Sequence, residues 1–338
     1  MPQYDDLFLR TELSDTGQYP STAATAYYSP DIIVWGTEPL EDPDVFLSEN
    51  YGKTWYKNVL FEQANYIYCR AKNLSSASQT GKLYLYYANG GLLSDVAKWR
   101  QNVIGTAIPD QNYVDLSARR EGQSGDITAG NSAFVWTPPV KGHYCFIAQI
   151  TTEDHPNPLP QSFKDQQAYV KWILDNPAVA WRNLSIVDST DKPEFQEEYN
   201  FQNLDPDRRE YLFLMQTTSL PVETSLTMIS GAVGPEPPIN TGTVVRRGNT
   251  SLSQTSTLPA HFDGSLLATV KLPTGQQWGP SMKVTIDIFA ITKMGDQTWF
   301  KELGTPLKVL DATNPDLADR EDVAVRLGRF TVQTDTES

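Results

Sequence analysis

Two tyrosine-rich apolar segments, each carrying one of the two cysteines, place the strongest constraint on how this 338-residue chain can fold. The first runs from Asn65 to Asn73 and the second from Gly142 to Ile150. Aromatic and β-branched residues in this density fit the pleated, half-buried surface of a β-strand. Because such strands can face each other across a sandwich, two states remain open for Cys69 and Cys145: a disulfide bridge, or two buried thiols acting as small hydrophobes.

Further segments show the same preference for strands. Residues 82–88 form an apolar run that ends at the turn signal Asn-Gly-Gly of residues 89–91. Residues 282–291 alternate clearly, with Val284, Ile286 and Ile288 on one face and Lys283, Thr285 and Asp287 on the other, which predicts an antiparallel strand with one buried and one solvated face. Helical signals are few: a short turn over 94–102, and one true helix over 162–175 that begins at a capping box and ends before a proline. Residues 38–50 are acidic and predict a loop.

The length suits two ordinary domains. Residues 1–27 predict an irregular N-terminal arm that is disordered or lies across its own domain or a neighbouring subunit, so oligomerisation through the arm is one alternative. The polar, proline-ended stretch 188–193 predicts a domain boundary. The expected fold is therefore all-β, with two antiparallel β-sandwich domains over 28–190 and 194–338 and one short α-helix.

The first half resembles the immunoglobulin-like β-sandwich modules of bacterial adhesion-type proteins. The resemblance spans residues 29–189 and depends on the segments 30–34, 71–73, 83–86 and 142–144. It implies an immunoglobulin-like first domain and a bacterial setting. An antibody-type tyrosine corner requires a tyrosine two residues before the second cysteine. Here Tyr144 directly precedes Cys145, so the resemblance does not extend to antibody domains.

Charge and hydropathy exclude some partners. The net charge of −14 and the pI of about 4.7 disfavour phosphate backbones, so nucleic acid is not an expected partner. No run approaches the roughly 18 apolar residues of a membrane-spanning helix, so no integral membrane segment is predicted. The N-terminus lacks a basic region followed by an apolar one, and therefore no Sec signal peptide is predicted. The expected location is the cytoplasm, or outside the cell by a signal-independent route.

Motifs that would support catalysis are missing from the sequence. The three histidines form no HxH or HExxH pattern, and CxxC, G-x-S-x-G and phosphate-loop motifs are also missing. The sequence thus predicts no enzyme, no catalytic residue, no metal site and no cofactor, with His143 and His155 as surface or strand-end residues. Acidic clusters over 38–44 and 316–322 leave Ca²⁺ as an alternative, although solvated loop charge is the favoured interpretation.

The segment 240–258 is rich in serine and threonine. Pore-forming proteins carry such hairpins, but a membrane strand needs about nine to eleven residues with a continuous apolar face. Val244, Leu252 and Leu258 are too sparse to supply that face. An exposed mobile loop is therefore the favoured prediction, with an inserting hairpin as the alternative.

Four tyrosines are the candidate binding residues. Tyr66 and Tyr68 share one face of their strand, and Tyr84 and Tyr86 share one face of theirs. If the two strands pair, the tyrosines form one aromatic patch, which is either core or a binding surface.

These observations favour a non-enzymatic binding or structural protein that recognises a protein or a glycan. The resemblance adds a bacterial secreted, toxin-associated or assembly-associated setting. One alternative is a membrane-active toxin, pore-forming or insecticidal. Another is a glycan hydrolase with a carboxylate pair, since paired carboxylates are what such hydrolysis needs.

Overall fold

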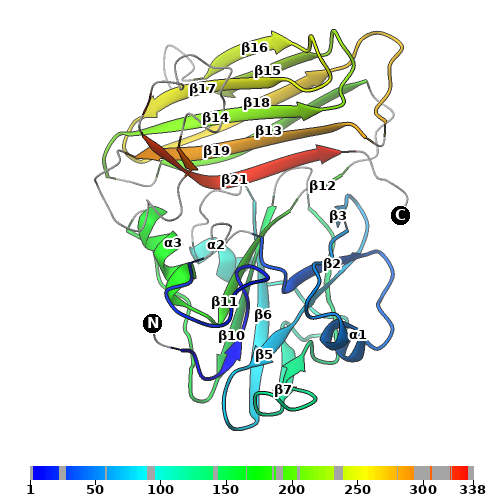
Figure 1. The fold of residues 1–338 in the computed structure, drawn as a ribbon, viewed down its shortest axis with the longest axis vertical. Coiled ribbons are helices and arrows are strands. Elements are labelled where there is room, and N and C mark those ends of the chain that lie inside the picture. The colour runs from blue at the N-terminus through cyan, green and yellow to red at the C-terminus, as the bar shows by residue number, and fades with distance from the viewer. Residues whose placement is uncertain are drawn as a thin grey trace. The chain divides into compact units, whose positions relative to one another are not determined.

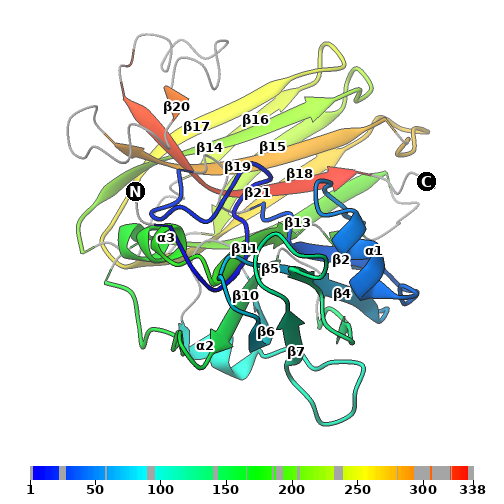
Figure 2. The same ribbon diagram turned by 60° about the horizontal axis from the view of Figure 1, so that its bottom comes forward.

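Antiparallel β-strands dominate the computed structural model of this chain (Figures 1 and 2). By its internal contacts the chain divides into two compact units, one formed by residues up to Leu184 and one formed almost wholly by residues from Ser185 onward. The structure describes residues 3–22, 28–57, 59–89, 96–139, 144–164, 166–184, 186–187, 193–203, 206–231, 239–279, 281–292, 305–306, 320 and 322–333.

Three antiparallel sheets build the first unit. The largest has the order β11 (Val179–Leu184), β10 (Tyr144–Thr152), β6 (Gln79–Asn89) and β7 (Val114–Ala118). A second contains β2 (Ile32–Gly36), β4 (Asn65–Cys69) and β9 (Phe134–Trp136). A third contains β1 (Leu7–Phe8), β5 (Ala71–Asn73) and β8 (Ile127–Thr128). Two further short strands are β3 (Val59–Leu60) in this unit and β12 (Ile186–Val187) in the other.

Aromatic rings pack between the first two sheets of this unit. The ring of Trp136 on β9 lies 4.9 Å from that of Tyr144 and 5.1 Å from that of Phe146, both on β10. All three side chains are almost fully buried. Edge-to-face packing of this kind adds to the stabilisation that burial provides.

The described chain contains three helices, where the sequence predicted one. The predicted helix over 162–175 is present as α3 (Gln166–Asp175), and the predicted turn over 94–102 is α2 (Val96–Gln101). The third, α1 (Pro43–Glu49), lies in the segment predicted as an acidic loop. Proline at its first turn suits a helix start, and the buried side chain of Leu47 anchors it. It lies beside β2, on the opposite side of the unit from α3 (Figures 1 and 2).

The N-terminal segment lies across its own unit, which is one of the predicted alternatives, and it contributes strand β1 there. Leu7, Phe8 and Leu9 are buried, and β1 pairs with β5. The prediction of one strand over 65–73 is also corrected. The chain leaves β4 at Cys69 and enters β5 at Ala71, and these strands belong to different sheets. Arg70 is the single residue at this crossover.

The second unit is a β-sandwich. One sheet has the order β13 (Glu194–Asn203), β18 (Phe262–Lys271), β15 (Ser225–Gly231) and β16 (Asn240–Val244). The other has the order β17 (Ser251–Leu258), β14 (Arg209–Thr218), β19 (Lys283–Thr292), β21 (Val323–Gln333) and β20 (Thr305–Pro306). Phe213 and Ile286 from one sheet and Leu226 and Met228 from the other share one buried core. Burial of this apolar area is the main driving force for the fold.

Two predictions for this unit were wrong. On β19, Val284, Ile286 and Ile288 are buried as predicted, but Thr285 and Asp287 on the opposite face are buried too, so that face is not solvated. The segment 240–258 is neither a loop nor a hairpin of two paired strands. It forms β16, which pairs with β15, and β17, which pairs with β14 in the other sheet.

Among the described residues, no helix is both long enough and apolar enough to cross a membrane.

A candidate aromatic binding surface

The four predicted tyrosines do not form one patch, because β4 and β6 lie in different sheets. Tyr68 is buried, and its hydroxyl accepts a hydrogen bond of 2.8 Å from the Leu40 backbone N–H. Tyr86 is also buried, and its hydroxyl donates to Gln149 Oε1 over 3.0 Å. Tyr66 and Tyr84 are each partly exposed. The tyrosines thus split into two inner and two outer side chains.

Tyr66 belongs to a larger aromatic group that the sequence did not reveal. Partly buried side chains of Trp35, Leu40, Phe46, Trp55 and Tyr66 pack over the buried residues Ile33, Leu47, Tyr68, Ala129 and Ala133. We call the five partly buried side chains the aromatic surface. Rings of Trp35 and Phe46 are 5.3 Å apart, those of Phe46 and Trp55 are 5.3 Å apart, and those of Trp35 and Trp55 are 6.0 Å apart. Each ring therefore contacts both others at an angle and stays partly exposed.

Local sequence explains how different elements contribute to the aromatic surface. Trp35 lies at a bulge in β2 and packs against the cluster that contains Ile33. Helix α1 supplies Phe46, and its Asp44 carboxylate accepts from Thr128 Oγ1 (3.0 Å) and from the Ala129 N–H (2.6 Å). These bonds fix the helix against β8. They also give one member of the first acidic cluster a structural role.

Polar, mostly acidic residues flank Leu40 and Phe46 of the aromatic surface in sequence, and we call them its rim. Glu38, Glu41 and Asp42 are exposed, and Lys57 places its ammonium 5.0 Å from the ring centre of Trp35. Nearby Val45 is 59% exposed.

In the part of the chain that the structure describes, no three His, Cys, Asp or Glu side chains are grouped to hold a metal ion. Most of the second acidic cluster lies outside the described residues, although Asp322 there pairs with Arg320.

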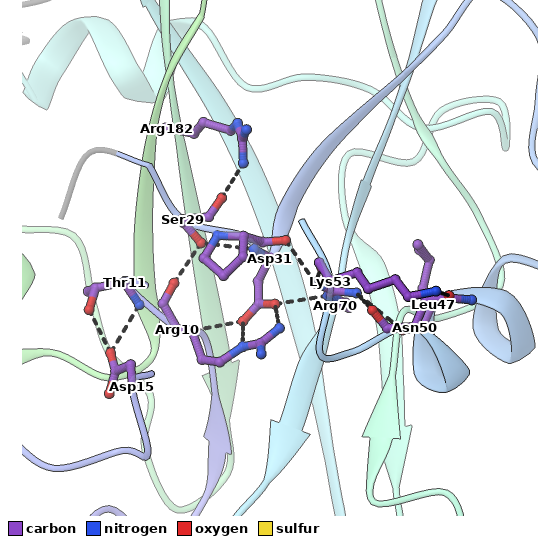
Figure 3. A network of polar contacts seen from close by, with 11 residues as sticks. Arg10, Thr11, Asp15, Ser29, Asp31, Leu47, Asn50, Lys53, Arg70 and Arg182 are labelled. Carbon is purple, nitrogen blue, oxygen red and sulfur yellow. Dashed lines mark hydrogen bonds and ion pairs between the residues drawn. The ribbon is translucent and has the colours of Figure 1, made fainter. Parts of the chain in front are cut away.

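A buried ionic network joins Arg10, Asp31 and Arg70 (Figure 3). Asp31 accepts hydrogen bonds from the Arg10 backbone N–H (2.8 Å), from Arg10 Nε (3.0 Å) and Nη2 (2.5 Å), and from Arg70 Nε (3.0 Å). Burial lowers the pKa of the Arg70 guanidinium, and the Asp31 carboxylate opposes that shift. The Tyr51 ring lies 3.4 Å from the Arg10 guanidinium carbon, a cation–π contact.

Arg70 connects this network to α1. Its terminal nitrogens donate to four backbone carbonyls, those of Pro30 (3.2 Å), Leu47 (3.3 Å), Asn50 (2.8 Å) and Lys53 (2.6 Å). Carbonyls at a helix C-terminus lack partners within the helix, and a cation there also complements the helix dipole. Arg70 therefore holds the end of α1 and the segment leading to Trp55, and so positions two rings of the aromatic surface.

Sequence reasoning missed this network, although a signal was present. Asp31 precedes the apolar run Ile-Ile-Val, and Arg70 interrupts an apolar strand pattern. A charge at such a position is buried only if it is paired, so two opposite charges in apolar strands suggest a partnership. A third arginine, Arg182, is buried as well; its Nη1 donates to the Ser29 carbonyl, and its guanidinium lies 4.6 Å from the Tyr56 ring centre.

His155 lies at the surface with its side chain 42% exposed, and it also contacts a buried carboxylate. Its Nδ1 lies 2.7 Å from Oδ2 of the fully buried Asp6, and its ring lies 5.1 Å from that of Tyr4.

Cys69 and Cys145 are both buried thiols, and no disulfide joins them. Burial raises the pKa of both thiols, that of Cys145 to about 12. His143 lies outside the described residues.

No protein-family model and no curated protein matches the chain. Solved structures with detectable likeness are β-rich. The isomalto-dextranase of Arthrobacter globiformis T6, solved with panose, is 11% identical with a TM-score of 0.19 and covers 67% of this chain and 34% of its own. An infectious bursal disease virus (Gx strain) chain is 9% identical, TM-score 0.18, covering 66% and 62%. Hazelnut (Corylus avellana) vicilin is 9% identical, TM-score 0.12, covering 63% and 77%.

This chain thus spans about a third of the length of the dextranase chain and 62% of the viral chain. TM-scores at this level assign neither a family nor an activity. The fold itself follows from the strands and their pairing: the chain is an all-β protein built from several antiparallel sheets, with a sandwich in its second unit.

Proposed function

We propose that this protein is a non-enzymatic binding component that recognises a neutral carbohydrate through the aromatic surface. One observation carries the proposal: the rings of Trp35, Phe46 and Trp55 contact one another and yet all remain partly exposed. Aromatic side chains offer large, rigid contact area at little entropic cost.

The rim of the surface favours a sugar without negative charge. Exposed Glu38, Glu41 and Asp42 can accept hydrogen bonds from sugar hydroxyls, while ring faces pack against the apolar C–H face of a pyranose. The net charge of −14 repels anionic glycans at long range. A protein ligand would use the same rings as anchor residues, and it is the competing outcome of the test below.

A glycan array tests the proposal. Labelled wild-type protein should bind a set of neutral glycans, and the double variant Trp35→Ala/Trp55→Ala should lose that signal. Trp172→Ala is the matched control, since Trp172 is also partly buried and packs against Trp99 and Phe163 in the same unit. Binding that survives in the double variant, or an array with no neutral glycan bound, would contradict the proposal. Co-purification of a protein that depends on Trp35 and Trp55 would favour the competing outcome.

A further inference from the structure

The two outer strands of one sheet in the second unit differ sharply in charge. Among the described strands, β13 and β16 end the four-stranded sheet. An outer strand presents unpaired backbone groups, and soluble proteins usually protect it with charged residues, proline or a bulge. β13 carries three glutamates, at positions 194, 197 and 198, and no lysine or arginine. β16, with the sequence Asn-Thr-Gly-Thr-Val, carries no charge at all.

Apolar side chains are exposed beside the uncharged edge. Six large hydrophobic side chains are exposed in the described chain, and three of them lie in or next to β15 and β16: Val222 (57%), Ile229 (39%) and Val244 (48%). Val244 pairs with Ser225 and Asn240 with Ile229, so Val244 and Ile229 share the outer face of the sheet. The edge is capped at its first residue, where the Asn240 N–H donates to Gln254 Oε1 over 3.1 Å. An uncharged edge next to exposed apolar side chains is the pattern of an interaction site.

Positive charge follows β16 after one buried residue, Val245. Arg246 and Arg247 are both exposed, and they are the only charged residues between positions 240 and 258. On β13, Glu194 and Glu198 are exposed and lie on the same face of the strand as Gln196. Glu194 has only a long, exposed ion pair with Lys271 (3.8 Å), which is worth little. The two edges of one sheet are therefore complementary in charge.

Strand direction makes the two edges compatible. Each neighbouring pair in the order β13, β18, β15, β16 is antiparallel, so β13 and β16 run in opposite directions. A second copy placed beside the first without being turned over would bring its β13 antiparallel to β16 of the first. In one register Arg246 stands opposite Glu194, Val244 opposite Gln196 and Gly242 opposite Glu198. The outer faces of both sheets then lie on the same side.

We propose that a second copy of this chain adds its β13 to the β16 edge of the first copy, which extends the sheet across the two molecules. Main-chain hydrogen bonds supply the pairing, and the arginines and glutamates select this pair of edges. Pairing of β13 with β13 is disfavoured by like charge. Because the two contacting edges differ, the contact is heterologous, and it repeats into a ring or a filament. This inference is independent of the carbohydrate proposal.

Variants that reverse the charge of one edge test the proposal. Their association is measured by sedimentation velocity on the full chain. The wild type should sediment faster as its concentration rises. R246E/R247E and E194R/E198R should each lose this dependence, because like charges then face each other in every pair of edges. An equal mixture of the two variants should regain it, since each edge again meets its opposite. R119E/R120E, which reverses an exposed arginine pair in the first unit, should behave as the wild type.

A wild type that stays monomeric at high micromolar concentration would overturn the proposal. So would association of R246E/R247E at the wild-type level, or a mixture that stays monomeric. Thermal unfolding of each variant checks that the second unit is folded. If a double variant fails to fold, Val244→Glu places one negative charge on the exposed part of β16 and should weaken association by itself.

Discussion

Arg70 donates from Nε to Asp31 Oδ1 over 3.0 Å, and both side chains are fully buried. Arg70 is the single residue between β4 and β5. The same guanidinium bonds the carbonyls of Leu47, Asn50 and Lys53. One side chain thus joins a sheet crossover, a helix end and the segment before Trp55. The aromatic surface depends on this contact, because Phe46 and Trp55 lie on the parts that Arg70 holds.

Replacement of Arg70 by methionine should strongly destabilise the first unit. The change keeps most of the side-chain volume but removes a buried charge partner, and breaking a buried pair in this way typically costs about 3–5 kcal/mol. Urea unfolding followed by tryptophan fluorescence reports mainly this unit, since six of the eight tryptophans belong to it. Lys171→Met, which breaks an exposed i,i+4 pair with Asp175, should change the free energy of unfolding by less than about 1 kcal/mol. Equal effects of the two changes would contradict the role given to Arg70.

Gly130→Ala should destabilise the protein more than Gly122→Ala does. Both glycines have positive φ, +71° and +78°, so backbone strain is common to both variants. A Cβ at Gly130 would lie 2.3 Å from Val114 Cγ1 and 2.7 Å from the Asp115 carbonyl oxygen, whereas at Gly122 it meets nothing within 4 Å. We expect about 1 kcal/mol for Gly122→Ala and clearly more for Gly130→Ala, as overpacking adds to strain. Thermal midpoints measured side by side decide this, and the reverse order would be incompatible with the packing described.

Both thiols should be unreactive in the folded protein. Cys69 and Cys145 are buried and not bridged, and burial raises the pKa of each, so little thiolate is present at neutral pH. Ellman's reagent should find no fast-reacting thiol in native protein and two after denaturation. Added reductant should leave the thermal midpoint unchanged. A midpoint that falls on reduction would indicate a disulfide and contradict the structure.

Alkaline pH should weaken the fold through the same thiols. The pKa of Cys145 is raised by burial to about 12, above its ordinary value of 9.0, so the folded state keeps a proton that the unfolded state releases. This contribution is fully present below about pH 9 and is lost as pH rises toward 12, at up to about 1.4 kcal/mol per pH unit for each such group. Urea midpoints measured above pH 9 should fall, and less steeply in Cys145→Ala. An identical slope in the variant would show that Cys145 does not contribute.

Local patterns in the sequence predicted much of the fold and little of the site. The capping signals around 162–175, the apolar run 82–88 and the alternation of 282–291 are properties of neighbouring residues, and each corresponds to an observed helix or strand. The crossover at Arg70 and the division of 240–258 between two sheets depend on which distant strands pair. No local pattern encodes that choice.

The aromatic surface could not be predicted from local patterns either, because its residues are distant in sequence. The alternation of Tyr66 with Tyr68 predicts a binding role for Tyr66, which does lie on the aromatic surface, whereas Trp35, Phe46 and Trp55 come from three separate segments. Their meeting requires α1, which forms in a stretch whose acidic residues and prolines predict a loop. Asp31 and Arg70 are 39 residues apart, so their pairing could only be suspected from two charges within apolar strands.

Calorimetric titration of a glycan selected on the array tests the central claim most directly. Trp55→Ala should bind that glycan at least about tenfold more weakly than the wild type, which corresponds to about 1.4 kcal/mol. Trp172→Ala should bind with the wild-type affinity. If Trp55→Ala binds as tightly as the wild type, or if both variants weaken equally, the aromatic surface is not the binding site.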